Sequence, residues 1–301
     1  MRNKNKLVSV IINCYNGSKY LNNSIDSVIS QTYQDWEIII WDNISTDESV
    51  KIAQKYSDEN KKIKIFVSPN HTNLYHARNL AINKSIGDII CFLDVDDYWY
   101  PFKLEEQVQL LNTKNVDLVY SNYDLFYEKN NKKIKSFIYK LPEGYITDFL
   151  FQKYCVGILT IAFNRKILKK NKSIFDSQYH MIGDFDFILK YSINNRIFVI
   201  NHPTAVYRIH DKNESFLKRN LRANELLNWY KQNYKIFSGY KNFQIVYFDA
   251  MYSMAIDYLI KSDKYSALKL IFKIRFSLRY LKLYVAIFIP SFILKILLNL
   301  L

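Results

Sequence analysis

The stretch CFLDVDDYW, residues 91–99, decides the fold expected for this chain. Its apolar first half, which two isoleucines extend toward the N-terminus, stops at three carboxylates, Asp94, Asp96 and Asp97. A short apolar run that ends at turn-forming residues indicates a strand buried on both faces. Acidic side chains at the carboxyl end of such a strand lie where open α/β sheets bind ligands. Crowded carboxylates repel one another, so the pattern predicts either a divalent cation site or a solvated acidic turn.

The residues around this stretch alternate between two hydrophobic patterns. Continuous apolar runs, typical of buried strands, occupy residues 7–12, 37–41, 64–67 and 88–93. Between them, apolar residues recur at helical spacing from residue 18 onward and over residues 72–85. This repeated alternation of strand and helix predicts an α/β fold with a Rossmann-like, mostly parallel, doubly wound sheet.

The pattern changes in the second third of the chain. Residues 117–127 and 132–139 are predicted to form the two strands of a hairpin, and helical patterns follow it. Beyond residue 216 almost every segment has a helical pattern. We therefore expect two domains, an α/β domain over residues 1–216 and a basic helical C-terminal region over residues 217–301.

The chain carries a formal net charge of +14, and the excess lies at its C-terminal end. Residues 218–301 hold 14 basic and 4 acidic side chains, against 28 and 24 in the rest of the chain. Such a basic segment can meet nucleic acid or an anionic membrane. The apolar tail at residues 280–301 has only twelve uncharged residues between its two lysines, whereas crossing a bilayer takes about 20. We expect this tail to lie in the membrane interface; the alternative is a terminal helix packed on the protein's own core.

The cysteines and the N-terminus indicate the cytoplasm. Cys14, Cys91 and Cys155 lie in apolar, strand-like settings, without a CxxC motif or an even framework, as structural thiols of a reducing compartment do. The basic N-terminus precedes an apolar run that is too short for a signal peptide and lacks a small-residue cleavage site. We expect a cytoplasmic protein that is peripheral on the inner face of the cytoplasmic membrane.

Polar residues also follow the other predicted strands. The first strand is followed by Asn13, Tyr15 and Asn16, and the second by Asp42 and Asn43. In a doubly wound sheet these ends converge with the acidic run on one crevice. Asp42 is placed to accept a hydrogen bond from a ring N–H of a nucleobase; a turn-initiating acid is the alternative.

Arg78 lies within HARNLAI, on the helix predicted just before the acidic strand. Its guanidinium fork matches phosphate, so it can bridge a phosphate to the acidic cluster. The alternative is a salt bridge on the protein surface.

Three ordered motifs carry a resemblance to a known family: NCYNGSKYLNNSIDSVISQTYQDWEIIIWDNISTDES, then HARNLAI, then GDIICFLDVDDYW. Together they resemble the family 2 glycosyltransferases of GT-A fold, over about residues 7–215. Several motifs in the same order and at the expected spacing argue against a chance match. The sequence departs from the family at Asn43, where a second aspartate is frequent, and at Asn13-Cys14, where Pro-Thr is common. Both departures lie at the edge that binds the base.

The resemblance implies a donor site and a metal site. Five residues would bind the donor: Tyr15, Asn16, Asp42, Arg78 and Asp94. Asp42 would contact the nucleobase, commonly uracil, Arg78 would support the nucleotide pocket, and Asp94 would hold the ribose side. Asp96, the second acid of the DXD motif, would bind Mn²⁺ or Mg²⁺ bridging the diphosphate. A divalent cation there stabilises the negative charge that gathers on a diphosphate leaving group.

Two later segments complete the implied site. FDSQYHMIGDFDFILKYS resembles the segment that carries the catalytic base; Asp184 matches that position, and Asp186 is the second choice. A carboxylate in a partly desolvated site can take the proton of an acceptor hydroxyl; a helix N-cap is the alternative. The segment YRIH, residues 207–210, resembles the one that closes the same site, where His210 would help to bind the metal or the donor phosphate.

The sequence thus predicts an inverting, metal-dependent glycosyltransferase. It would move a sugar from a nucleotide diphosphate donor, a UDP-sugar foremost, to a hydroxyl of a lipid-linked or cell-surface glycan. A nucleotidyltransferase of related fold would need a glycine-rich phosphate loop near the N-terminus, which this sequence lacks. A nucleic-acid-binding protein would place its basic residues among exposed aromatic ones, whereas here the charge accompanies an apolar tail, so no nucleic-acid partner is expected. An inactive scaffold is disfavoured by the complete set of acids and His210.

Overall fold

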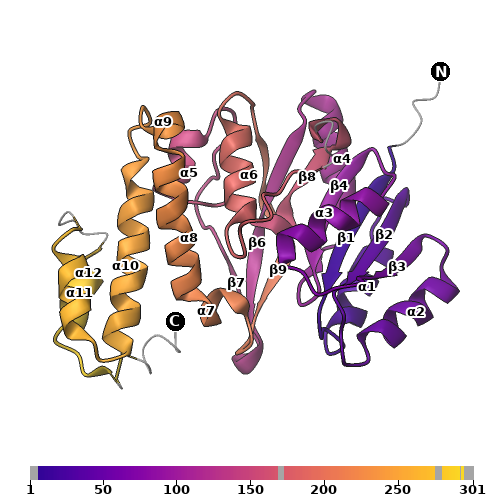
Figure 1. Cartoon of the computed structure of the whole chain (residues 1–301). Helices are drawn as coiled ribbons and strands as arrows, with labels where there is room; N and C mark the ends of the chain where they lie inside the picture. Colours follow the sequence, from indigo (N-terminus) through magenta and orange to yellow (C-terminus); the bar gives the residue numbers. More distant parts are fainter. Residues whose placement is uncertain (1–5, 169–172, 275–279, 292, 295–301) are drawn as a thin grey trace. The chain divides into compact units, whose positions relative to one another are not determined.

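The computed structural model of the chain describes residues 6–168, 173–274, 280–291 and 293–294. Its internal contacts define two compact units, Met1–Thr147 with Cys155–Asp211, and Asp148–Tyr154 with Lys212–Leu301 (Figure 1). Compact units need not be independent domains, so the expected domain boundary after residue 216 stays a prediction.

A mixed nine-stranded sheet forms the first unit, in the order β3-β2-β1-β4-β8-β6-β9-β5, with β7 paired to β6. The strands are β1 Val8–Cys14, β2 Trp36–Asp42, β3 Ile63–Val67, β4 Ile89–Asp94, β5 Tyr98–Trp99, β6 Leu118–Tyr127, β7 Lys132–Lys135, β8 Ala162–Asn164 and β9 Phe198–Ile209. The first four strands pair in parallel, and β8 runs antiparallel to both of its neighbours, β4 and β6. The predicted α/β class is confirmed, with a parallel half and a mixed half.

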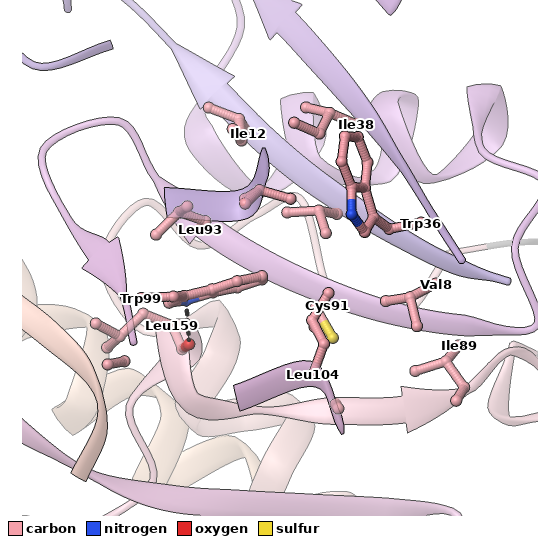
Figure 2. Packing of buried hydrophobic residues seen from close by; sticks show 14 of the residues in the cluster. Val8, Ile12, Trp36, Ile38, Ile89, Cys91, Leu93, Trp99, Leu104 and Leu159 are labelled. Carbon is pink, nitrogen blue, oxygen red and sulfur yellow. Dashed lines mark hydrogen bonds between the residues drawn. The ribbon is translucent and has the colours of Figure 1, made fainter. Parts of the chain in front are cut away.

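Helices cover both faces of the sheet because its central strands are apolar on both sides. The helices of this unit are α1 Leu21–Ile29, α2 Ser49–Glu59, α3 Leu74–Lys84, α4 Lys103–Thr113 and α6 Gly183–Ser192. Alternate residues of β1, β2 and β4 form one buried cluster with α1, α2 and α4, in which the indole N–H of Trp99 donates to the carbonyl of Leu159 (Figure 2). On the opposite face, Phe92 of β4 contacts Phe175 and lies under the guanidinium of Arg78 from α3. Each large apolar side chain buried in this way contributes about 2 kcal/mol to folding.

The strands predicted in the first hundred residues are present, with ends shifted by one or two residues. The predicted hairpin is also present, although β7 ends at Lys135 and not at residue 139. Four elements of the first unit were not predicted: α4, β5, β8 and β9. The buried face of α4 includes Lys103 and Gln107 beside its leucines and valine. These polar residues interrupt the apolar stripe by which a helix is recognised in a sequence.

The second unit is helical. Its helices are most of α5 Thr147–Gln152, with α7 Glu214–Leu217, α8 Arg219–Gln232, α9 Tyr234–Phe237, α10 Gln244–Ile260, α11 Lys264–Ile271 and α12 Leu281–Ala286. Its core is aromatic: Trp229 is fully buried and contacts Phe151, Phe237 and Phe243. Of the helices in the part of the chain that the structure describes, none is long and apolar enough to cross a membrane. Residues 292 and 295–301 of the predicted interfacial tail lie outside the described residues.

Candidate active site

The carboxyl ends of three neighbouring strands bring the predicted donor residues together. In the register of the sheet, Asn13 of β1 lies between Trp41 of β2 and Asp94 of β4, and Cys14 is opposite Asp42. Strands in a sheet are about 4.8 Å apart, so Asp42 and Asp94 are separated by two strand spacings, about 10 Å. The edge of the sheet where the sequence predicted a crevice therefore carries a row of polar residues.

Asp42 lies at one end of this row and is 1% exposed. One carboxylate oxygen, Oδ2, accepts a hydrogen bond from the backbone N–H of Ser45 at 2.9 Å. The other oxygen, Oδ1, is buried and has no hydrogen-bond partner within the described chain. Burying such an acceptor without a partner costs about 1–3 kcal/mol, so this oxygen calls for an explanation.

The loops after β1 and β2 are tied to each other beside Asp42. Asn16, at a φ of 51°, accepts from the backbone N–H of Thr46 at 2.8 Å, and its own N–H donates to the hydroxyl of Ser45 at 2.8 Å. Tyr15 is exposed and its ring meets His71 edge-on at 4.8 Å. Asn16 thus shapes the loop, whereas Tyr15 presents an aromatic surface to solvent.

Asn43, one of the departures from the family pattern, holds the loop before α3. Its amide donates to the carbonyl of Thr72 at 2.7 Å and accepts from the backbone N–H of Thr72 at 3.1 Å. An aspartate has no N–H to donate to that carbonyl. Asparagine at this position therefore has a local structural reason.

Arg78 is 2% exposed, so it is not the surface salt bridge that was its alternative interpretation. Its Nη2 donates to Oδ1 of Asp94 at 2.5 Å. Burial disfavours the guanidinium charge, but the neighbouring groups Asp94, Tyr75 and Asp184 together outweigh burial and raise the pKa of Arg78. The cation is therefore permanent and holds Asp94 in one orientation at the end of β4.

The carboxylate of Asp96 meets the imidazole of His210, which directly follows β9. Nε2 of His210 and Oδ2 of Asp96 are 3.0 Å apart, and both side chains are largely covered. The His210 ring lies against the ring of Tyr20, with 5.1 Å between centroids, and the Tyr20 hydroxyl donates to Glu128 at 2.8 Å. The sequence alone gave no reason to single out Tyr20, because its partners lie far along the chain.

Asp97, which had no role from the sequence, fixes the end of β9 to this turn. Its Oδ1 accepts from the backbone N–H of Arg208 at 2.9 Å, and the Arg208 side chain donates to the carbonyl of Asp96 at 2.8 Å. The other oxygen of Asp97 is buried and has no hydrogen-bond partner in the described residues. Burial and the neighbouring acids raise the pKa of Asp97 well above its ordinary value.

The Asp96–His210 pair fits a divalent cation that is shared with a phosphate ligand. No cluster of three or more His, Cys, Asp or Glu residues suited to a metal occurs in the described ranges. Mg²⁺ is typically bound by one or two carboxylates, and its other ligands are substrate phosphates and waters. A site with one carboxylate and one imidazole would leave positions open for such ligands. The residues present therefore match a metal that arrives with its nucleotide.

Asp184 lies in the first turn of α6. Its Oδ1 accepts a hydrogen bond of 2.7 Å from the hydroxyl of Tyr75, which comes from α3. Asp186, the second choice, is 3% exposed and forms an ion pair with Lys190 at 2.6 Å. Of the two carboxylates, Asp184 is the more accessible one.

Comparison of the sequence with known proteins identifies its relatives. The sequence model described as glycosyl transferase family 2 matches residues 9–171. The chain is 32% identical, over 54% of its own length, to the Escherichia coli UDP-Glc:alpha-D-GlcNAc-diphosphoundecaprenol beta-1,3-glucosyltransferase WfgD. It is 31% identical, over 55%, to a putative teichuronic acid biosynthesis glycosyltransferase, TuaG, of Bacillus subtilis. These matches span only 62% and 65% of the two relatives' lengths. A glycosyltransferase of Methanocaldococcus jannaschii is 31% identical, with 89% of this chain and 93% of that protein covered.

Solved structures share the architecture. Residues 1–349 of Staphylococcus aureus TarS, in complex with UDP-GlcNAc, superpose with a TM-score of 0.60 at 17% identity, covering 87% of this chain and 88% of that one. The mannosyltransferase PcManGT of Pyrobaculum calidifontis, in complex with GDP-Man and Mn²⁺, gives a TM-score of 0.60 at 16% identity, covering 94% and 79%. At these identities the likeness establishes the fold.

Proposed function

Because the chain belongs to glycosyl transferase family 2 and is a glycosyltransferase of GT-A fold, we propose that it transfers a sugar from a nucleotide diphosphate donor to a glycan hydroxyl, with inversion. The donor is proposed to be a UDP-sugar, in line with the UDP-Glc in the name of the Escherichia coli relative and the UDP-GlcNAc bound to TarS. The acceptor is proposed to be a lipid-linked or cell-surface glycan, since that relative is named for a diphosphoundecaprenol acceptor.

One observation carries the proposal. Five residues at one edge of the sheet hold buried polar atoms without a hydrogen-bond partner in the described structure: Asn13, Trp41, Asp42, Arg78 and Asp97. Unpaired buried groups are rare in folded proteins, so a cluster of them indicates a polar ligand that completes their hydrogen bonds. From Asp42 through Asp94 to Asp96 and His210, the row would meet in turn a base, a ribose and a diphosphate.

We assign these groups the following roles in the proposed reaction. The acceptor hydroxyl attacks the anomeric carbon, a new C–O bond forms, and the bond to the diphosphate oxygen breaks on the opposite face of the sugar. Asp184 takes the hydroxyl proton as general base. Asp96 and His210 would hold Mn²⁺ or Mg²⁺, which when bound neutralises charge on the leaving diphosphate. Burial raises the pKa of Asp94, Arg78 favours its ionised form against that effect, and their hydrogen bond holds the carboxylate in one orientation.

Three variants test this assignment in titrations with UDP and in transfer assays with UDP-glucose or UDP-GlcNAc. We expect Asp42→Ala to weaken UDP binding, and Asp96→Ala to remove the dependence of UDP affinity on Mn²⁺. Asp184→Asn should bind UDP normally, and its transfer rate should be lower by a factor of about 10²–10⁴. As a matched control, Asp58→Asn replaces an exposed carboxylate of α2 and should change none of these. Transfer that is as fast in EDTA as in Mn²⁺ would refute the metal assignment.

We further propose peripheral contact with the inner face of the cytoplasmic membrane. Leu281, Val285 and Phe288 are spaced by four and three residues and are all exposed, while Leu283 and Ala286 between them are buried. Helix α12 and the turn after it therefore expose apolar side chains as well as burying others, which suits the interface of a bilayer. Four exposed lysines in the preceding segment supply attraction to anionic lipid: Lys261, Lys264, Lys269 and Lys273.

Vesicle sedimentation tests the membrane contact. The protein should sediment with phosphatidylglycerol vesicles and much less with phosphatidylcholine vesicles. The double change Val285→Ser and Phe288→Ser should reduce sedimentation strongly, and Ile236→Ser, which alters another exposed apolar residue, should not. Equal sedimentation of all forms would rule out this face as the contact.

A further inference from the structure

Helix α3 connects the proposed donor residues to the proposed base. Tyr75 and Arg78 are three residues apart and therefore lie on one face of the helix. Arg78 binds Asp94 at the end of β4, and Tyr75 binds Asp184 at the start of α6. The guanidinium of Arg78 is 5.3 Å from the centre of the Tyr75 ring. One rigid face thus contacts both the carboxylate that meets the donor and the one that would meet the acceptor.

The Tyr75 ring has little freedom to move. It is 3% exposed and contacts the ring of Phe175 at 5.3 Å between centroids. Gly183 lies directly against it, because a Cβ added to Gly183 would be 2.5 Å from Cγ of the tyrosine ring. The first turn of α6 therefore approaches the ring as closely as a residue without a side chain allows. The phenol oxygen has one position, and it holds Asp184 in one rotamer.

Charge reinforces this contact. Burial, together with the carboxylate of Asp184, raises the pKa of Tyr75 well above its ordinary value, so the phenol keeps its proton and remains a donor. Two charged groups from neighbouring elements interact with Asp184, the guanidinium of Arg78 on α3 and the carboxylate of Asp94 on β4. On its own helix the nearest charges, Asp186 and Lys190, are engaged with each other.

We propose that Tyr75 is a positioning residue for catalysis: it occupies Oδ1 of Asp184 and leaves Oδ2 to receive the proton of the acceptor hydroxyl. This inference rests on the proposed role of Asp184 as the base. Within the described residues, Tyr75 is the side chain that donates to this carboxylate. A hydrogen bond donated to a carboxylate is short and strong, so it fixes which of the two oxygens stays open to the acceptor hydroxyl. Tyr75 of α3 would thereby act on a carboxylate that lies 109 residues further along the chain.

The test compares Tyr75→Phe with Tyr120→Phe. Tyr120 is another buried tyrosine of the same unit, and its hydroxyl donates to the carbonyl of Pro142 at 2.6 Å. Phenylalanine keeps the aromatic ring at both positions, including the Tyr75 ring that packs against Gly183, so both variants should fold. Circular dichroism and thermal melting check this. The measurements are kcat and KM for transfer from the UDP-sugar, UDP affinity, and the dependence of kcat on pH.

For Tyr75→Phe we expect kcat at pH 7 to fall about tenfold, since a hydrogen bond to a charged group is lost, while UDP affinity stays within twofold. The pH profile of kcat should change as well, because the lost hydrogen bond acts on the group that takes the proton. Tyr120→Phe should leave kcat and the profile unchanged. A purely structural role for Tyr75 would lower the melting temperature without changing the pH profile, and that result would overturn the proposal.

A double variant separates failure of this inference from failure of the proposed function. If Tyr75 acts through Asp184, adding Tyr75→Phe to Asp184→Asn should not slow the residual transfer further. A full tenfold effect in that background would show that Tyr75 acts elsewhere. If Asp184→Asn itself transfers at the normal rate, the proposed base is wrong. If Asp184→Asn is inactive but Tyr75→Phe has normal kcat and a normal pH profile, only the positioning role is wrong.

Discussion

Lys103 provides a sharp test of how burial controls charge in this protein. It is the first residue of α4 and is fully buried. Its Nζ donates to Oε1 of Gln107 at 2.5 Å and lies 4.0 Å from the centre of the Trp99 ring. Burial lowers the pKa of Lys103 from 10.5 to about 8. We predict that Lys103→Met makes the stability of the protein less dependent on pH.

The sign and size follow from proton binding. Below pH 8 the lysine is charged in both states, so the folded state carries the full cost of a buried cation. Between pH 8 and 10.5 the folded state has released its proton and the unfolded chain has not, so stability rises with pH. A pKa that falls from 10.5 to about 8 corresponds to about 3 kcal/mol at about 1.4 kcal/mol per pH unit. Loss of the bond to Gln107 offsets about 1–2 kcal/mol of the gain in the methionine variant at pH 7.

Urea unfolding followed by circular dichroism between pH 7 and 10.5 measures this effect. The free energy of unfolding of Lys103→Met minus that of the unmodified protein should fall by about 3 kcal/mol across that range. Taking the difference cancels the titration of the tyrosines, which both proteins share. Lys55→Met, at an exposed position of α2, should give a difference that does not vary with pH. A constant difference for Lys103→Met as well would refute the reasoning, because it would mean that burial does not shift this lysine.

Three further predictions concern stability. Gly183→Ala should cost about 1–3 kcal/mol, because the new methyl group would overlap the aromatic ring across from it, whereas Gly239→Ala, with open space around it, should change the free energy of unfolding by less than about 0.5 kcal/mol. Burial would raise the pKa of Asp47, but hydrogen bonds from Ser18 and Ser49 lower it to about 2. Asp47→Asn should therefore be less stable than the unmodified protein at neutral pH, and the difference should disappear as the pH falls from about 4 to 2 in acid titrations. Trp229→Ala should cost about 3–5 kcal/mol in urea unfolding by emptying the aromatic core of the helical unit, and Trp229→Phe should cost less.

Much of the parallel half of the sheet follows from the sequence. The strands β1, β2 and β4 are buried on both faces and are mostly apolar, interrupted by Ser9 in β1 and by Glu37 in β2. Asp42 and Asp94 are recognisable because each is the last residue of such a strand. Local patterns suffice here because a parallel strand covered by helices on both sides has to be apolar throughout.

The mixed half was harder to predict for physical reasons. β9 contains Asn201, His202 and Pro203, and its register with β6 shifts at that point, so neither a continuous run nor a regular alternation is present. β8 has only three residues. The contacts that complete the candidate site, Tyr75 with Asp184 and Asp96 with His210, join residues more than 100 positions apart. No local pattern records them; the resemblance to a family nominated three of these four residues, and Tyr75 came from the structure.

The place of β9 in the sheet has a consequence for how the protein is made. The strands β1 to β4 are complete once the first hundred residues have been synthesised, and they pair with one another. β9 is the last strand in the sequence, yet it lies between β6 and β5. His210 can reach Asp96, and the backbone of Arg208 can reach Asp97, only after that strand has entered the sheet. A chain that stalls on the ribosome before β9 would hold its acidic turn without these two partners, so the proposed metal site would be complete only after translation has passed residue 210.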